Sequence, residues 1–100
     1  MDFKALYADK QMTAAQAAAL VQSGDWVDYG WTANTPVAVD AALAQRLPQL
    51  EGVNFHGGIL MWVPEIFQIP DPAAHMTWNS WHMSGIERKA IAQGFAFYCP

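Results

Sequence analysis

The sequence predicts an α/β fold in which a mostly parallel, open sheet is flanked by helices. Helical and strand-like segments alternate along the chain from about residue 13 onward, an order that is typical of parallel α/β layers. The composition is that of a packed domain, because 53% of the 100 residues are apolar and only 14% are charged. These values exclude intrinsic disorder and a coiled coil.

The first quarter of the chain carries helical signals. Residues 1–12 form a lead-in with one or two helical turns. Residues 13–23 form the first clear helix, because Thr13 and Gln16 fit a capping box and the interior is rich in alanine. Residues 25–31 then read as a strand from their aromatic and β-branched content.

A second helix is expected over residues 36–47, with Thr35 as its N-cap and Pro36 as its first residue. Residues 53–62 form the next strand, and the apolar second half of this strand indicates cover on both faces. Within it, the pair Gly57–Gly58 indicates a β-bulge or tight packing under a neighbouring helix, or else a place where a ligand approaches the sheet closely.

The last part of the chain repeats the alternation. Residues 75–81 read as a third strand, and a third helix over residues 85–93 begins with a capping box formed by Ser84 and Glu87. A fourth strand begins at Phe95. Ligands of open parallel sheets bind beyond the carboxyl ends of the strands, which makes three loops candidates for binding: residues 30–35, 62–68 and 79–84.

Charge and cysteine content narrow the class of protein. The net charge is −4 and only five residues are Lys or Arg, which argues against nucleic acid and against an anionic membrane surface as partners. No apolar run approaches the about 20 residues that a bilayer requires, and no signal peptide is expected. Together with the single Cys99, these features predict a cytoplasmic protein.

The loop that joins the first strand to the second helix is a candidate anion site. Free N–H groups and the positive end of the dipole at a helix N-terminus attract anions, and Thr32, Asn34 and Thr35 add polar side chains. The alternative is an ordinary turn whose polar residues only cap the helix. The loop contains neither a Walker sequence nor a dinucleotide-binding fingerprint.

The remaining unusual residues have simpler interpretations. Aromatic side chains bury large areas. We therefore expect Trp62, Trp78 and Trp81 to lie in the core or in an interface, and not to form a pocket wall or a platform for a sugar. The three histidines and Cys99 match no zinc-binding spacing, so no metal site is predicted.

Three stretches together resemble the acetyl-CoA hydrolase/transferase family, in the family's order and over nearly the whole chain. The likeness is to its butyryl-CoA:acetate and 4-hydroxybutyrate CoA-transferases. It implies that residues 1–100 are the amino-terminal portion of a CoA-transferase-like α/β domain that is incomplete in itself. The stretches are residues 23–30 (SGDWVDYG) with Thr35–Pro36, residues 57–65 (GGILMWVPE), and residues 77–82 (TWNSWH) with Ser84–Gly85 and Arg88–Lys89.

The resemblance implies an enzyme that transfers coenzyme A between short-chain acyl-CoA and carboxylic acids of the acetate, butyrate and 4-hydroxybutyrate class. Members of the family use a glutamyl-CoA thioester. The catalytic glutamate of the family lies downstream of anything that matches residues 1–100, so we expect no catalytic residue in this chain and no activity from the chain alone. Hydrolysis of acyl-CoA, or a non-catalytic binding or assembly role, remains an alternative.

The resemblance also implies partners and contact residues. Coenzyme A is expected as a substrate, with no permanently bound cofactor, and the remainder of the enzyme or a partner chain is expected to complete a homo-oligomer. The family's amino-terminal part supplies walls for the carboxylate or acyl group. The matching positions are Gly30, Trp31, Thr32, Asn34 and Thr35 in the first loop, and Met61, Trp62, Asn79 and His82 further along.

Overall fold

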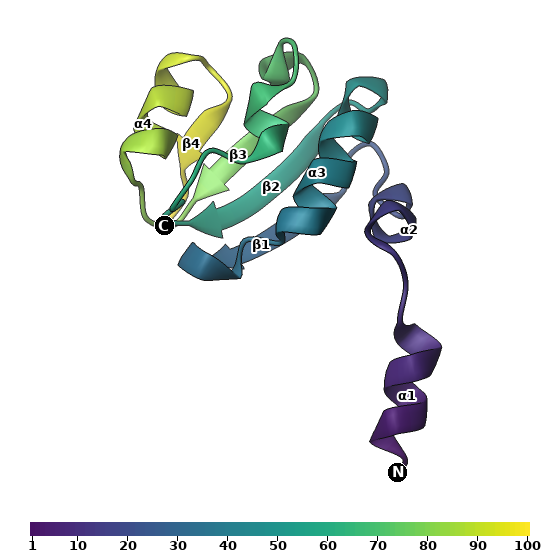
Figure 1. Cartoon of the computed structure of the whole chain (residues 1–100). Coiled ribbons are helices and arrows are strands. Elements are labelled where there is room, and N and C mark those ends of the chain that lie inside the picture. Colours follow the sequence, from purple (N-terminus) through teal and green to yellow (C-terminus); the bar gives the residue numbers. More distant parts are fainter.

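The computed structural model describes residues 1–100 and contains one sheet of four parallel strands in the order β1-β2-β3-β4 (Figure 1). The predicted α/β class, the parallel sheet and the succession of helices and strands are confirmed. The strands are β1 (Trp26–Trp31), β2 (Val53–Gly58), β3 (Met76–Ser80) and β4 (Ala96–Tyr98).

The helices are α1 (Phe3–Lys10), α2 (Ala14–Ala19), α3 (Val37–Arg46) and α4 (Gly85–Ala92). Helix α1 projects away from the rest of the molecule and buries no residue (Figure 1). Helix α2 packs against α3 and starts in the predicted capping box, but it ends at Ala19 instead of residue 23. None of the helices has the length and apolar character that crossing a membrane requires.

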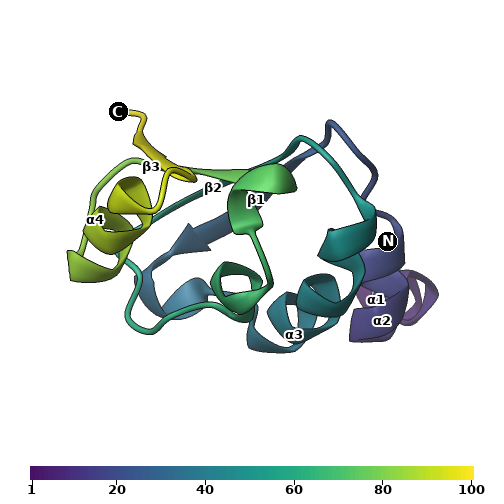
Figure 2. The same ribbon diagram turned by 90° about the horizontal axis from the view of Figure 1, so that it is seen from above.

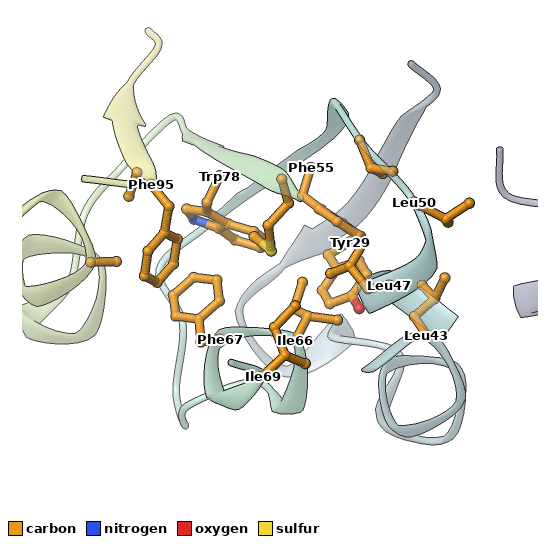
Figure 3. Packing of buried hydrophobic residues seen from close by; sticks show 14 of the residues in the cluster. Tyr29, Leu43, Leu47, Leu50, Phe55, Ile66, Phe67, Ile69, Trp78 and Phe95 are labelled. Carbon is orange, nitrogen blue, oxygen red and sulfur yellow. The ribbon is translucent and has the colours of Figure 1, made fainter. Parts of the chain in front are cut away.

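Helices α3 and α4 lie on the same side of the sheet (Figure 2). The core fills the space between them and the strands (Figure 3). Its centre is the edge-to-face packing of Tyr29 against Phe55 and Trp78, and a 3₁₀ helix, Glu65–Gln68, closes it from below with Phe67. Each fully buried large side chain stabilises the fold by about 1.5–3 kcal/mol. The packed core therefore holds in place the strand ends from which the loops extend.

Strand β2 is shorter than the sequence predicts. It ends at Gly58, and Ile59 adopts a left-handed backbone conformation with φ of +45°. Two hydrogen bonds draw the chain out of the sheet, because the Ile59 amide donates to the carbonyl of His82 and the Leu60 amide donates to Glu87. The prediction of a strand over residues 53–62 with cover on both faces is therefore wrong beyond Gly58.

The start of α3 also differs from the prediction. The hydroxyl of Thr35 donates to the carbonyl of Thr32 at 3.0 Å and closes a 3₁₀ turn over Thr32–Asn34. Thr35 is thus not the N-cap; Pro36 takes that position and the helix begins at Val37. Strand β3 continues through Ser80, as the predicted strand over residues 75–81 requires. Asn79 therefore lies in this strand and not in the candidate loop over residues 79–84.

Candidate functional site

The parallel strands bring the three candidate loops to one edge of the sheet, where β1, β2 and β3 end. The amide of Ile59 donates to the carbonyl of His82 at 2.8 Å and joins the loop after β2 to the loop after β3. The ring of Trp31, at the end of β1, lies 5.8 Å from the ring of Trp81 and 6.1 Å from that of His82. Trp31 and His82, predicted from separate loops, are therefore neighbours.

The pair Gly57–Gly58 lets two indole rings lie directly against β2. A Cβ atom on Gly57 would lie 2.9 Å from the ring of Trp78 on the helix side, and one on Gly58 would lie 2.4 Å from the ring of Trp31 on the opposite side. Both distances are far below a normal contact, so the space that each missing Cβ leaves is already filled, as in the predicted tight packing, and not by the backbone of a ligand. The residues that approach are the chain's own tryptophans.

Two of the three non-glycine residues with positive φ lie at the same edge; the third, Asp71, precedes β3. Thr32 and Ile59, which directly follow β1 and β2, have φ of +49° and +45°. This left-handed conformation costs a β-branched residue about 1–3 kcal/mol, and residues held in this way cluster at functional sites. Nothing in the sequence signals this strain, because it depends on contacts between loops.

The other predicted site residues divide into two groups. Asn34, Met61 and Trp62 are exposed on the loops of this edge. Thr35 is only 7% exposed and its hydroxyl is already engaged. Asn79 lies within β3, where its amide donates to the carbonyl of Phe55 and to the hydroxyl of Thr77. The structure thus gathers Gly30, Trp31, Thr32, Asn34, Met61, Trp62 and His82 along the edge. Thr35 adjoins them, but its buried hydroxyl is bonded to Thr32, and Asn79 lies within β3 with its amide engaged.

A buried carboxylate fixes the loop after β2 at its beginning. Glu87 is fully buried and accepts hydrogen bonds from the amide of Leu60 at 3.0 Å and from the amide of Ser84 at 2.7 Å. The hydroxyl of Ser84 also donates to it, and the hydroxyl of Ser80, which donates to the carbonyl of His82 at 2.9 Å, lies 3.4 Å away. Sequence analysis assigned Glu87 only to a capping box, whereas the structure shows that it also ties α4 to the loop after β2.

A second buried carboxylate fixes the same loop at its end. Asp40 of α3 accepts from the hydroxyl of Tyr29 at 2.8 Å and from the amides of Glu65 and Ile66 at 2.7 and 3.3 Å. Burial, and then the charge and hydrogen bond of Asp40, raise the pKa of Tyr29 well above its ordinary value, so the phenol stays protonated and continues to donate. Between the two anchored ends lie three exposed apolar residues, Met61–Val63, which we call the apolar tip.

A cavity of about 580 Å³ lies between α4, the loop after β2 and the 3₁₀ helix Glu65–Gln68. Lys89 is the only charged residue in its lining. The sequence analysis missed the contribution of α4, although Ile86, Lys89, Ala90 and Gln93 have the spacing of one helix face. The apolar part of the lining consists of Leu60, Val63, Phe67, Ile86 and Ala90.

The chemistry available at this edge is that of binding. An apolar cavity with one cation suits a short aliphatic group that carries a carboxylate or thioester oxygen. Both oxygens of Asp40 and of Glu87 already accept hydrogen bonds, so neither carboxylate is free to attack a substrate. No group of three His, Cys, Asp or Glu side chains is placed to hold a metal ion.

Comparison with known proteins identifies the family of this sequence. The sequence matches the profile of the acetyl-CoA hydrolase/transferase N-terminal domain over residues 1–100. The chain belongs to this family. Over all 100 residues it is 55% identical to the butyryl-CoA:acetate CoA-transferase of Anaerostipes caccae, and this match covers 22% of that enzyme.

Two further CoA-transferases are similar over 94% of the chain. The probable butyrate:acetyl-CoA coenzyme A-transferase of Syntrophomonas wolfei is 40% identical, and the succinyl-CoA:cyclohexane-1-carboxylate CoA transferase of Geobacter metallireducens is 33% identical. The matches cover 21% of each. This acetyl-CoA hydrolase/transferase N-terminal region thus spans about a fifth of the length of the curated relatives that it matches.

Solved structures show the same fold. RipA from Yersinia pestis superimposes with a TM-score of 0.77 over the whole of this chain and 26% of its own, at 23% sequence identity. A mutant of RipA gives a TM-score of 0.78 at 22% identity, again over the whole of this chain and 25% of the other. At these identities the likeness concerns the fold alone.

Proposed function

We propose that this chain is the amino-terminal part of an enzyme that moves coenzyme A between short-chain acyl-CoA and carboxylic acids of the acetate and butyrate class. The observation that carries the proposal is the 55% identity to a butyryl-CoA:acetate CoA-transferase over all 100 residues. The family also contains hydrolases, so water as the acceptor in place of a carboxylate is the second candidate. The enzyme would work in the cytoplasm as a homo-oligomer.

In this proposal the chain contributes binding walls and no nucleophile. Trp31, His82 and the strained Thr32 border one side of the edge, and the apolar tip borders the other. The cavity beside α4 offers an apolar lining and the ammonium group of Lys89, which suits an alkyl group with a charged or polar end. Preformed walls of this kind orient a reacting group at little entropic cost.

The nucleophile would be a glutamate from the rest of the enzyme. Its carboxylate attacks the acyl-CoA carbonyl and displaces the CoA thiolate, which then attacks the glutamyl carbonyl and releases the first carboxylic acid. The resulting glutamyl-CoA thioester passes CoA to the incoming carboxylate by the same steps in reverse. Splitting the exchange in this way replaces one difficult step with easier ones, and coenzyme A itself is the only cofactor-like molecule required.

A chimaeric enzyme tests the proposal. Residues 1–100 replace the matched stretch of the Anaerostipes caccae transferase, and exchange of CoA between butyryl-CoA and acetate is measured. We expect the chimaera to catalyse the exchange and the isolated 100 residues to catalyse none. A folded chimaera without activity would contradict the proposed function, and turnover by the isolated chain would contradict the placement of the nucleophile elsewhere.

Site variants of the chimaera test the cavity. Lys89→Met should raise the KM for the carboxylate about tenfold, equivalent to about 1.4 kcal/mol of lost binding, with a smaller effect on kcat. The matched control is Lys4→Met on α1, which lies far from the cavity (Figure 1) and should leave both constants unchanged. Equal constants for the two variants would remove Lys89 from the proposed site.

A further inference from the structure

The side of the sheet that faces away from α3 and α4 carries no covering layer (Figure 2). We call it the open face. Strand register places two rows of side chains on it, one from Trp26 through Asn54 to Thr77 and one from Asp28 through His56 and Asn79 to Phe97. Parallel sheets occur almost exclusively with both faces covered, so we expect another polypeptide segment to cover the open face.

Three aromatic rings are in contact on the open face, from Trp26 through His56 to Trp81, and Phe97 is exposed separately on β4. The ring of His56 lies 6.4 Å from that of Trp26 and 4.1 Å from that of Trp81, edge-to-face in both cases. Trp26 is 64% exposed and Phe97 is 50% exposed. Aromatic side chains contribute much of the binding energy at protein interfaces. These four residues come from β1, β2, β4 and the loop after β3.

The polar side chains of the open face are already paired with one another. The hydroxyl of Thr77 donates to the amide oxygen of Asn54 at 3.0 Å and accepts from the amide of Asn79 at 3.1 Å. Asp28 accepts from the amide of Gly30 at 2.6 Å, and its other oxygen lies 3.6 Å from Nδ1 of His56. A buried polar group is costly only when it loses its partners, so an apolar layer can cover the bonded Asn54, Thr77 and Asn79 amide and hydroxyl groups, whereas the half-exposed Asp28 carboxylate has to stay hydrated or gain a donor.

The exit of the chain points to the occupant. The amide of Cys99 donates to the carbonyl of Ser80, which holds the end of the chain against the sheet, and Pro100 emerges on the side opposite α3 and α4 (Figure 2). The curated relatives are matched over only 21–22% of their length, so most of such an enzyme lies outside this region. A second copy stacked on the open face would obstruct this exit.

We propose that the open face is the docking surface for the polypeptide that follows this region in the longer relatives. That polypeptide supplies the second helical layer of the sheet, with an apolar surface laid over the Trp26, His56 and Phe97 side chains. Asp28 is the only acidic side chain in the two rows, and it lies beside His56, so the layer is expected to be apolar over the aromatic side chains and to leave the Asp28 carboxylate hydrated or offer it a donor.

Cysteine labelling in the chimaera described above tests this proposal. Cys99→Ser removes the thiol of this region. A single cysteine is then introduced, either as Phe97→Cys on the open face or as Ile91→Cys on the outer surface of α4. In this structure Phe97 is 50% exposed and Ile91 is 43% exposed. Peptide mass spectrometry measures the rate of reaction with a maleimide in native and in urea-denatured chimaera. We expect native labelling at position 97 to be at least about tenfold slower than in urea, with much less protection at position 91.

Equal rates at position 97 in native and denatured protein would overturn the proposal. Protection that disappears on dilution would also overturn it, because it would identify a second copy as the occupant. If the chimaera does not fold, the same two cysteines at the aligned positions of the Anaerostipes caccae enzyme give the same readout. No CoA transfer is measured, so failure here is separable from failure of the proposed function.

Discussion

Replacing Glu87 with glutamine removes a charged acceptor and keeps the shape of the side chain. One oxygen of Glu87 accepts from the Leu60 amide and the other accepts from the Ser84 amide. A glutamine must place its NH₂ group at one of these positions, where a backbone N–H then lacks an acceptor. A hydrogen bond to a charged group contributes about 1.5–3 kcal/mol, and relief of the buried charge offsets part of that loss.

We therefore expect Glu87→Gln to lower the free energy of unfolding by about 1–3 kcal/mol, with a fall in Tm on the order of 10 °C for a domain of this size. Urea unfolding followed by tryptophan fluorescence measures the first quantity, and thermal unfolding followed by near-UV circular dichroism measures the second. The matched control is Glu65→Gln, an exposed carboxylate whose replacement should change stability by less than about 0.5 kcal/mol. Equal stability of the two variants would refute the role assigned to Glu87.

Three further predictions concern the other anchors of this edge. The folded-state pKa of Tyr29 is raised, so the contribution of its protonated phenol to the free energy of unfolding is complete below the ordinary pKa of about 10. At higher pH this contribution is lost, by up to about 1.4 kcal/mol per pH unit. Urea unfolding between about pH 8 and 11 should show a steeper loss for the native protein than for Tyr29→Phe, and parallel profiles would contradict the shift. Gly58→Ala places a methyl group 2.4 Å from the ring of Trp31, so it should displace this indole and destabilise the fold by about 1–3 kcal/mol, which urea unfolding measures. Gly85→Ala, with its nearest neighbour at 3.6 Å, should leave the urea midpoint unchanged, and equal midpoints for the two variants would contradict the close packing on Gly58. Thr32→Gly relieves the positive φ and should raise the free energy of unfolding by about 0.5–1 kcal/mol, and a lower urea midpoint would show that the threonine side chain contributes more than its strain costs.

Much of the fold could be predicted because its signals are local. The capping boxes at Thr13 and Ser84 start α2 and α4 as expected, and β-branched and aromatic residues mark the strands. In an alternating α/β chain these signals also determine the parallel sheet and the edge at which the loops meet. Trp31 and His82 could therefore be expected at the same edge of the sheet from sequence alone.

The errors occur where distant contacts override local preference. The apolar run after Gly58 has the composition of a strand, but Ile59 leaves the sheet because hydrogen bonds to His82 and Glu87 hold the chain outside it. The roles of Asp40 and Glu87 depend on amides that lie 25 to 27 residues away in the sequence, which no local pattern reveals. The cavity has the same origin, since its wall combines α4 with a loop from the preceding crossover.

The adjacent glycines of β2 couple two layers that would otherwise be independent. Trp78 rests on one side of this backbone and Trp31 on the other, with only the thickness of a single strand between them. A repacking mutation that shifts the hidden indole would be transmitted through the backbone to the indole at the rim. Attempts to alter the specificity of the proposed site should therefore screen positions in the hydrophobic interior together with those along the edge of the sheet.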